Sequence, residues 1–146
     1  MAEPSVGLLA LVEHANLDSI SFIELSARRG PVAEGRSGGP RAPTYMLTTN
    51  GTDDGSRFRI ALRVDLELEE GEVQVTAQAD YTVAGPGTGS VTRHGVVEYA
   101  NEVGIMTLLP YLRQAIADLT QRVFDTALLM PVQPRGAVSF PLPNEE

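Results

Sequence analysis

The chain has 146 residues, of which 42% are hydrophobic and 21% charged, and its formal net charge is −8. This negative balance argues against binding to DNA or to an anionic membrane, because both require clustered basic residues. The absence of cysteine excludes disulfides and thiolate metal sites, and no apolar run approaches the 18 residues of a membrane span. We therefore expect one cytoplasmic domain, residues 1–146, without nucleic-acid binding or membrane insertion.

The first predicted element is a strand over residues 9–24, and its apolar positions are Leu17, Ile20 and Phe22. Residues 27–43 follow, and their glycine and proline content predicts a long crossover loop. A second, short strand is predicted over Tyr45–Thr49, ended by the turn signal Asn50-Gly51.

Two longer segments, residues 57–68 and 72–83, alternate apolar with polar or small residues. A period of two is typical of strands with one buried and one wet face. Glu69, Glu70 and Gly71 join them, which predicts a hairpin. Pairing Leu66 with Val75 places the apolar residues of both strands on one face, so we expect a well-specified register.

The helical part is predicted to begin with a short helix over residues 96–100 and to turn at residues 101–104. The main helix, which Thr107 can cap, runs to Val123 with an apolar stripe of period 3.6 at Ile105, Leu108, Leu109, Leu112, Ile116, Leu119 and Val123. The chain is then extended over residues 127–132, and the proline-rich tail, residues 134–146, is expected to be mobile. This order predicts an α+β fold: a four-stranded antiparallel sheet with two C-terminal helices packed on one face.

Two patterns suggest chemistry but have simpler explanations. Residues 85–90, rich in glycine, resemble a phosphate-binding loop, yet no lysine precedes a serine or threonine there, which favours a flexible connection. His94, Glu98 and Glu102 have the spacing of metal ligands on one helix face, but Gly95 weakens the helix there and a third strong ligand is missing, which favours a solvated polar face. We expect no catalytic residues, no metal and no cofactor.

A run of acidic residues lies on the predicted hairpin: Asp65, Glu67, Glu69, Glu70 and Glu72. Such a run keeps a protein soluble and discourages pairing of strand edges. It also fits a docking patch for a basic partner or for positively charged unfolded chains.

Several short stretches, taken in order, resemble one family. They are Asp18-Ser19-Ile20-Ser21-Phe22, the strand Phe58–Val64, Tyr81-Thr82-Val83-Ala84-Gly85, and Leu108-Leu109-Pro110-Tyr111-Leu112-Arg113 followed by Leu128, Leu129, Pro131 and Val132. Over residues 9–133 the chain is similar to SecB and the SecB-like chaperones, which include proteins of export and of toxin–antitoxin systems.

The resemblance implies a single SecB-like domain and an ATP-independent holdase for unfolded or pre-secretory polypeptides, assembled as a homotetramer (a dimer of dimers). It implies client-binding grooves between the second strand, the crossover loop and the main helix, with walls at Tyr45, Met46, Leu47, Leu119, Val123, Phe124, Leu128 and Met130. For Leu119 and Val123, a place in the core or in a subunit interface explains the pattern as well.

The chain departs from export SecB at several points. Residues 27–43 hold no aromatic residue, Ile23 stands where the family's first-strand signature has Glu, and the tail is proline-rich. These departures weaken the expectation that the SecA motor is a partner, so an antitoxin is an equally fitting client. A non-chaperone scaffold on the same fold, with one specific partner, is the alternative from another class, and a small-molecule site in the sheet is a third.

Overall fold

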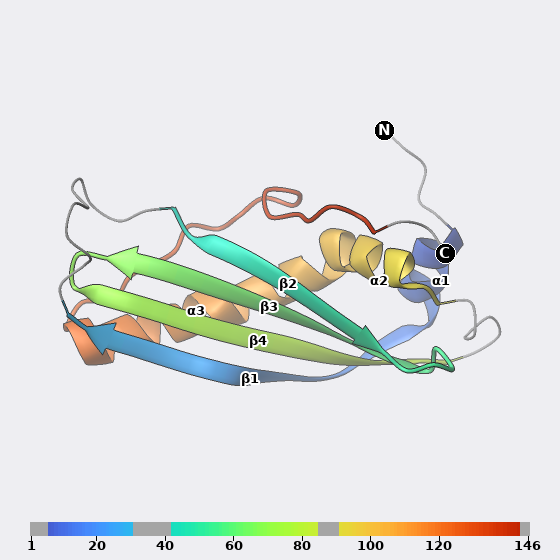
Figure 1. Cartoon of the computed structure of the whole chain (residues 1–146), viewed down its shortest axis with the longest axis horizontal. Helices are drawn as coiled ribbons and strands as arrows, with labels where there is room; N and C mark the ends of the chain where they lie inside the picture. Colours follow the sequence, from blue (N-terminus) through green and yellow to red (C-terminus); the bar gives the residue numbers. More distant parts are fainter. Residues whose placement is uncertain (1–5, 31–41, 85–90, 144–146) are drawn as a thin grey trace.

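The computed structural model describes residues 6–30, 42–84 and 91–143. A four-stranded antiparallel sheet carries helices on one face, which confirms the predicted fold class (Figure 1). The strands are β1 (Ala15–Arg29), β2 (Thr44–Gly51), β3 (Arg57–Leu68) and β4 (Gly71–Val83), in the spatial order β1-β4-β3-β2. The helices are α1 (Val6–His14), α2 (Arg93–Tyr99), the π-helical turn η2 (Ala100–Gly104) and α3 (Ile105–Phe124).

The β3–β4 hairpin forms with the predicted faces but with a shifted register. Leu66 lies opposite Val73, not Val75, and Leu68 lies opposite Gly71. A shift of two residues leaves every side chain on its own face, so the apolar pattern could not distinguish the two registers. Gly71 has φ +154° and passes so close to β1 that a Cβ would stand 1.9 Å from the carbonyl oxygen of Arg28. The tight turn therefore depends on glycine at this position.

The predicted first strand is wrong over its N-terminal part. Residues 6–14 form helix α1, in which Leu8 and Leu11, three residues apart, are buried. Strand β1 then extends to Arg29, into the segment predicted as a crossover loop, while residues 31–41 of that segment lie outside the described residues. Strand β2 likewise continues through the predicted Asn50-Gly51 turn, and the chain reverses at residues 52–56 instead.

The turn predicted at residues 101–104 is also wrong, because the chain stays helical from Arg93 to Phe124 through η2. Thr107 does not cap α3, since its hydroxyl donates to the carbonyl of Val103. Gly104 lets η2 approach the sheet, as a Cβ there would lie 2.8 Å from Cδ1 of Ile60. The predicted α3 stripe packs on the inner face of the sheet, and its fully buried members include Ile105, Leu108, Leu112 and Ile116.

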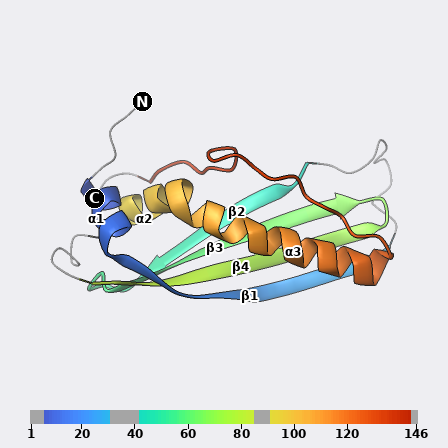
Figure 2. The same cartoon turned by 180° about the vertical axis from the view of Figure 1, so that it is seen from behind.

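After α3 the chain returns toward α2 without regular structure, on the β2 side of the helix (Figure 2). The sequence predicts a mobile tail over residues 134–146, and the described part of it, residues 134–143, contacts other elements of the fold. Val138 is buried in the core cluster, and Phe140 is hydrogen-bonded to Asn101. These contacts have no signal in the sequence, because an extended segment held by side chains of other elements has no periodicity of its own.

Candidate functional site

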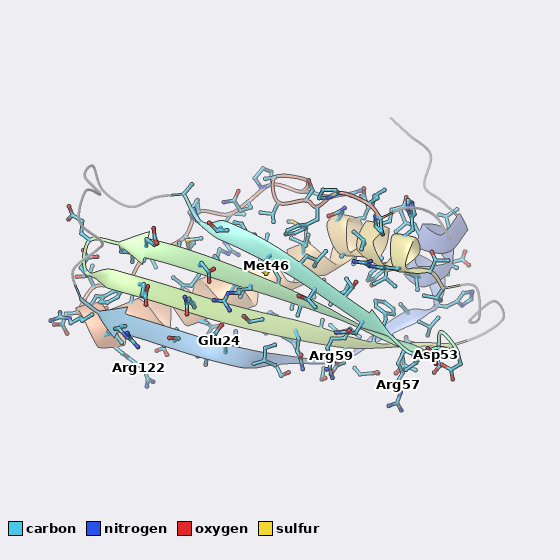
Figure 3. The ribbon with its side chains drawn as sticks, in the orientation of Figure 1. Glu24, Met46, Asp53, Arg57, Arg59 and Arg122 are labelled. Carbon is cyan, nitrogen blue, oxygen red and sulfur yellow. The ribbon has the colours of Figure 1, made fainter. Side chains whose placement is uncertain are left out.

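The structure separates the three client-binding residues predicted on β2. Tyr45 and Leu47 lie opposite Val64 and Leu62, face the helices and are partly buried. Partial burial raises the pKa of the Tyr45 hydroxyl. Met46 points to the opposite, open face of the sheet and is 56% exposed (Figure 3). The alternation of a strand therefore divides these three residues between two surfaces.

Two of the predicted client-binding residues, Phe124 and Leu128, line a pocket together with Glu69 and Glu70 of the predicted acidic run. A pocket of about 180 Å³, here called the hairpin-end pocket, is lined by Leu68, Glu69, Glu70, Thr120, Phe124, Thr126, Ala127 and Leu128. Phe124 is only 6% exposed and belongs to the core, so it forms the inner wall of the pocket. Leu119, Val123, Leu128 and Met130 are partly buried against the same core. The pocket thus combines an apolar interior with two carboxylates at its rim.

Thr120 shapes the chain that closes this pocket. Its buried hydroxyl donates to the carbonyl of Ile116 at 2.7 Å and accepts the backbone N–H of Leu128 at 2.7 Å. Asp125 ends α3 in the left-handed conformation with φ 64°. Arg29 of β1 donates from Nε to the carbonyl of Val123 at 2.7 Å, which satisfies a free carbonyl at the helix end. The pocket wall is therefore fixed by polar contacts to both α3 and β1.

The predicted acidic patch is smaller than its sequence suggests. On the open face, Arg63 lies between Asp65, at 2.9 Å, and Glu24, at 3.1 Å, and so neutralises part of its charge. Glu69 and Glu70 are exposed, and neither forms an ion pair with another described residue. The uncompensated charge is consequently concentrated at the hairpin end of the sheet, beside the hairpin-end pocket.

A second apolar surface was missed as a site. We call it the β1 strip: Leu17, Phe22, Ile23 and Leu25, each between 38% and 58% exposed. Leu17 and Leu25 pair with Tyr81 and Val75 of β4, so they face the helix side. Figure 2 shows that α3 crosses the sheet diagonally and reaches β1 only near its end. The strip was hidden in the sequence because β-bulges at Asp18 and Ile23 break its alternation.

Of the two other patterns that suggest chemistry, only the metal-ligand spacing lies within the described residues. His94 contacts Glu98 at 3.8 Å, whereas Glu102 pairs with Arg135. The described residues contain no cluster of three or more potential metal ligands. The glycine-rich segment 85–90 lies outside the described residues. None of the helices in the described part of the chain is long and apolar enough to cross a membrane.

The chain matches no protein-family model and no curated protein. Its fold matches the SecB-like chaperone Rv1957 of Mycobacterium tuberculosis, solved in complex with a ChAD peptide from the Rv1956 HigA1 antitoxin, with a TM-score of 0.75 at 17% identity. The match covers 90% of this chain and 99% of that one. The fold is SecB-like.

This confirms the architecture that the short motifs predicted. A protein of unknown function from Streptococcus agalactiae is also similar, at 11% identity and a TM-score of 0.42, over 81% of this chain and 97% of that one. The SecB-like fold thus places the hairpin-end pocket and the β1 strip on a scaffold that another protein uses as a chaperone.

Proposed function

We propose that this protein is a member of the SecB-like family and acts in the cytoplasm as an ATP-independent holdase for unfolded or partly folded polypeptides. The observation that carries the proposal is the β1 strip, which leaves four large apolar side chains exposed on a SecB-like fold. Unfolded chains present apolar side chains, and an apolar surface of this kind packs against many sequences without strict geometry. No catalytic step is part of this function.

The hairpin-end pocket narrows the class of client. Its apolar interior suits one large aliphatic or aromatic side chain, and Glu69 and Glu70 at the rim suit a neighbouring Arg or Lys. A segment with an apolar residue next to a basic one meets both requirements. Antitoxin segments and pre-secretory chains are both candidate sources, and the structural similarity to a chaperone that binds an antitoxin peptide favours the first.

We further propose that the protein is a homotetramer, a dimer of dimers. β1 is an edge strand of 15 residues, and the β1 strip lies beside its outer edge. Long exposed edges with apolar neighbours tend to pair with another chain. The β1 strip is thus suited to contact either a sister subunit or a client, and the two cases predict different results for variants of the strip.

The test is whether the purified protein suppresses aggregation of a chemically denatured substrate without ATP. We expect suppression, together with a light-scattering mass four times that of the 15.6 kDa chain. A protein that stays monomeric at micromolar concentration and leaves aggregation unchanged is not a holdase. One dominant partner in a pull-down, in place of many clients, would instead identify a scaffold.

Two matched variants locate the client surface. Phe22→Ser with Leu25→Ser removes two members of the β1 strip, whereas Leu9→Ser with Val12→Ser removes two exposed apolar residues of α1. If the strip binds clients, the first variant loses suppression and keeps its mass; if it forms the subunit interface, the mass falls. The α1 variant should change neither.

For the hairpin-end pocket, Glu69→Gln with Glu70→Gln should weaken binding of a peptide that pairs leucine with arginine, and the effect should shrink at high salt. Glu13→Gln in α1 is the control for loss of a single charge, since α1 lies at the other end of the sheet from the β3–β4 hairpin (Figure 1).

A further inference from the structure

Residues 134–143 lie against α2 and η2 in the way that a bound peptide would. Within the described part of this segment, one backbone hydrogen bond is internal, from the N–H of Ala137 to the carbonyl of Pro134 at 3.0 Å. The other polar contacts go to side chains of α2 and η2. The segment therefore takes its conformation from the surface beneath it, not from its own hydrogen bonds.

Asn101, in the π-helical turn, makes the main polar contact. Its side-chain amide donates to the carbonyl of Phe140 at 2.9 Å, and its side-chain oxygen accepts the N–H of the same residue at 2.9 Å. A two-point contact with the backbone of one residue holds an extended chain whatever its side chain. Single-turn π-bulges are often found at functional sites.

Further contacts with the segment lie on either side of Asn101. The Nδ1 of His94 lies 2.8 Å from the carbonyl of Pro143, and Glu102 pairs with Arg135. Val138 is 9% exposed, Ser139 is exposed, and Phe140 is partly buried against the core. Apolar residues two positions apart thus enter the surface while the residue between them faces water, as in strand-like peptide recognition.

We propose that this surface, here called the tail seat (His94, Asn101, Glu102 and the core beneath Val138 and Phe140), is a binding site for extended polypeptide, and that residues 134–143 are its tethered occupant. A client segment with two apolar residues in alternate positions displaces the tail and takes over the contact with Asn101. The inference rests on the proposed holdase function and adds a specific subsite to it.

Tethering makes the tail a strong competitor. A segment joined by a short linker acts at an effective concentration of about 1 mM, so a free client binds only in the fraction of time that the seat is open. Weakening the tail should therefore strengthen client binding without any new contact.

The test uses the full chain with Val138→Ser and Phe140→Ser, which weakens the tail and leaves the seat intact. Leu142→Ser, an equivalent change at an exposed position of the same segment, is the control. The probe is a fluorescent synthetic peptide of residues 134–143 with the native sequence. We expect the double variant to bind it at least about ten-fold more tightly than the wild type or Leu142→Ser, and the additional change Asn101→Ala to remove that gain.

Amide hydrogen exchange on the wild-type chain tests the same idea without a variant. Saturation with a reduced, carboxymethylated unfolded protein should accelerate exchange of the Phe140 amide. Unchanged exchange at saturation, or equal peptide affinity in all variants, overturns the tail seat while leaving the holdase function standing. Peptide binding that increases as expected, with no binding of the unfolded protein, overturns the holdase function instead.

Discussion

Replacing Thr120 with valine should loosen the wall of the hairpin-end pocket. Valine keeps the shape of threonine but removes the oxygen that accepts the N–H of Leu128 at 2.7 Å. The loss of that bond leaves a partly buried N–H without its partner, which costs about 1–2 kcal/mol of unfolding free energy. For a chain of this size, that corresponds to a fall in Tm of about 3–8 °C.

The assay is thermal unfolding at equal protomer concentration, because assembly also contributes to the apparent stability. Thr120→Ser is the matched control, since serine retains the hydroxyl and loses only a methyl group. Exchange of the Leu128 amide should accelerate in Thr120→Val and stay slow in Thr120→Ser. If Thr120→Val is as stable as the wild type, or if its Leu128 amide stays protected, the hydroxyl does not hold the pocket wall.

Three further predictions concern the stability of the fold. In Gly104→Ala, the gain in helix propensity should approximately cancel the cost of the clash with Cδ1 of Ile60. Ile60→Val removes that atom, so a double-mutant cycle in denaturant unfolding should show a favourable coupling of about 1 kcal/mol between the two changes. Additive effects would contradict the close approach. Hydrogen bonds from Ser56, chiefly its backbone N–H, lower the pKa of Asp54 to about 2, so the contribution of this carboxylate is present above its ordinary pKa of 3.8 and is lost as the pH falls toward 2. An NMR titration should show this low value, and an ordinary pKa would show that the turn is not hydrogen-bonded in solution. The hydroxyl of Tyr81 is buried without a hydrogen-bond partner among the described residues, and burial raises its pKa. Ionising it therefore costs more free energy in the folded chain than in the unfolded one, so the fold loses stability as the pH rises above 10. Tyr81→Phe should therefore keep or raise the unfolding free energy at pH 7 and reduce the loss above pH 10; a less stable Phe variant would reveal a hydrogen bond.

Much of the fold was predictable because the alternation on β3 and β4 and the stripe on α3 are local patterns with clear periods. They identified the sheet, its buried face and the helix that covers it. The same local reasoning failed at α1, where residues 9–14, including the buried Leu11, were assigned to a strand. It also failed at η2, because a π-turn that continues a helix has no sequence signal comparable to that of a cap.

The candidate site was predictable only in pieces. Phe124, Leu128, Glu69 and Glu70 were all singled out from the sequence, but as a groove wall and as a separate acidic patch. The end of α3 returns to the β3–β4 hairpin, and that contact brings the two groups into one pocket. Met46 was grouped with Tyr45 by sequence proximity, although strand geometry directs them to opposite faces.

By itself the sequence determined the class of this protein: an acidic α+β chain with a buried sheet face, an amphipathic helix, and motifs whose order resembles SecB-like chaperones. These properties follow from local periodicity and short motifs, which any folded arrangement must respect. Only the tertiary structure decided which apolar residues stay exposed and what becomes of the tail. The β1 strip depends on the diagonal course of α3, and the tail seat depends on Asn101 meeting Phe140 across 39 residues. Contacts between segments so distant in sequence have no local signal, because only packing brings them together.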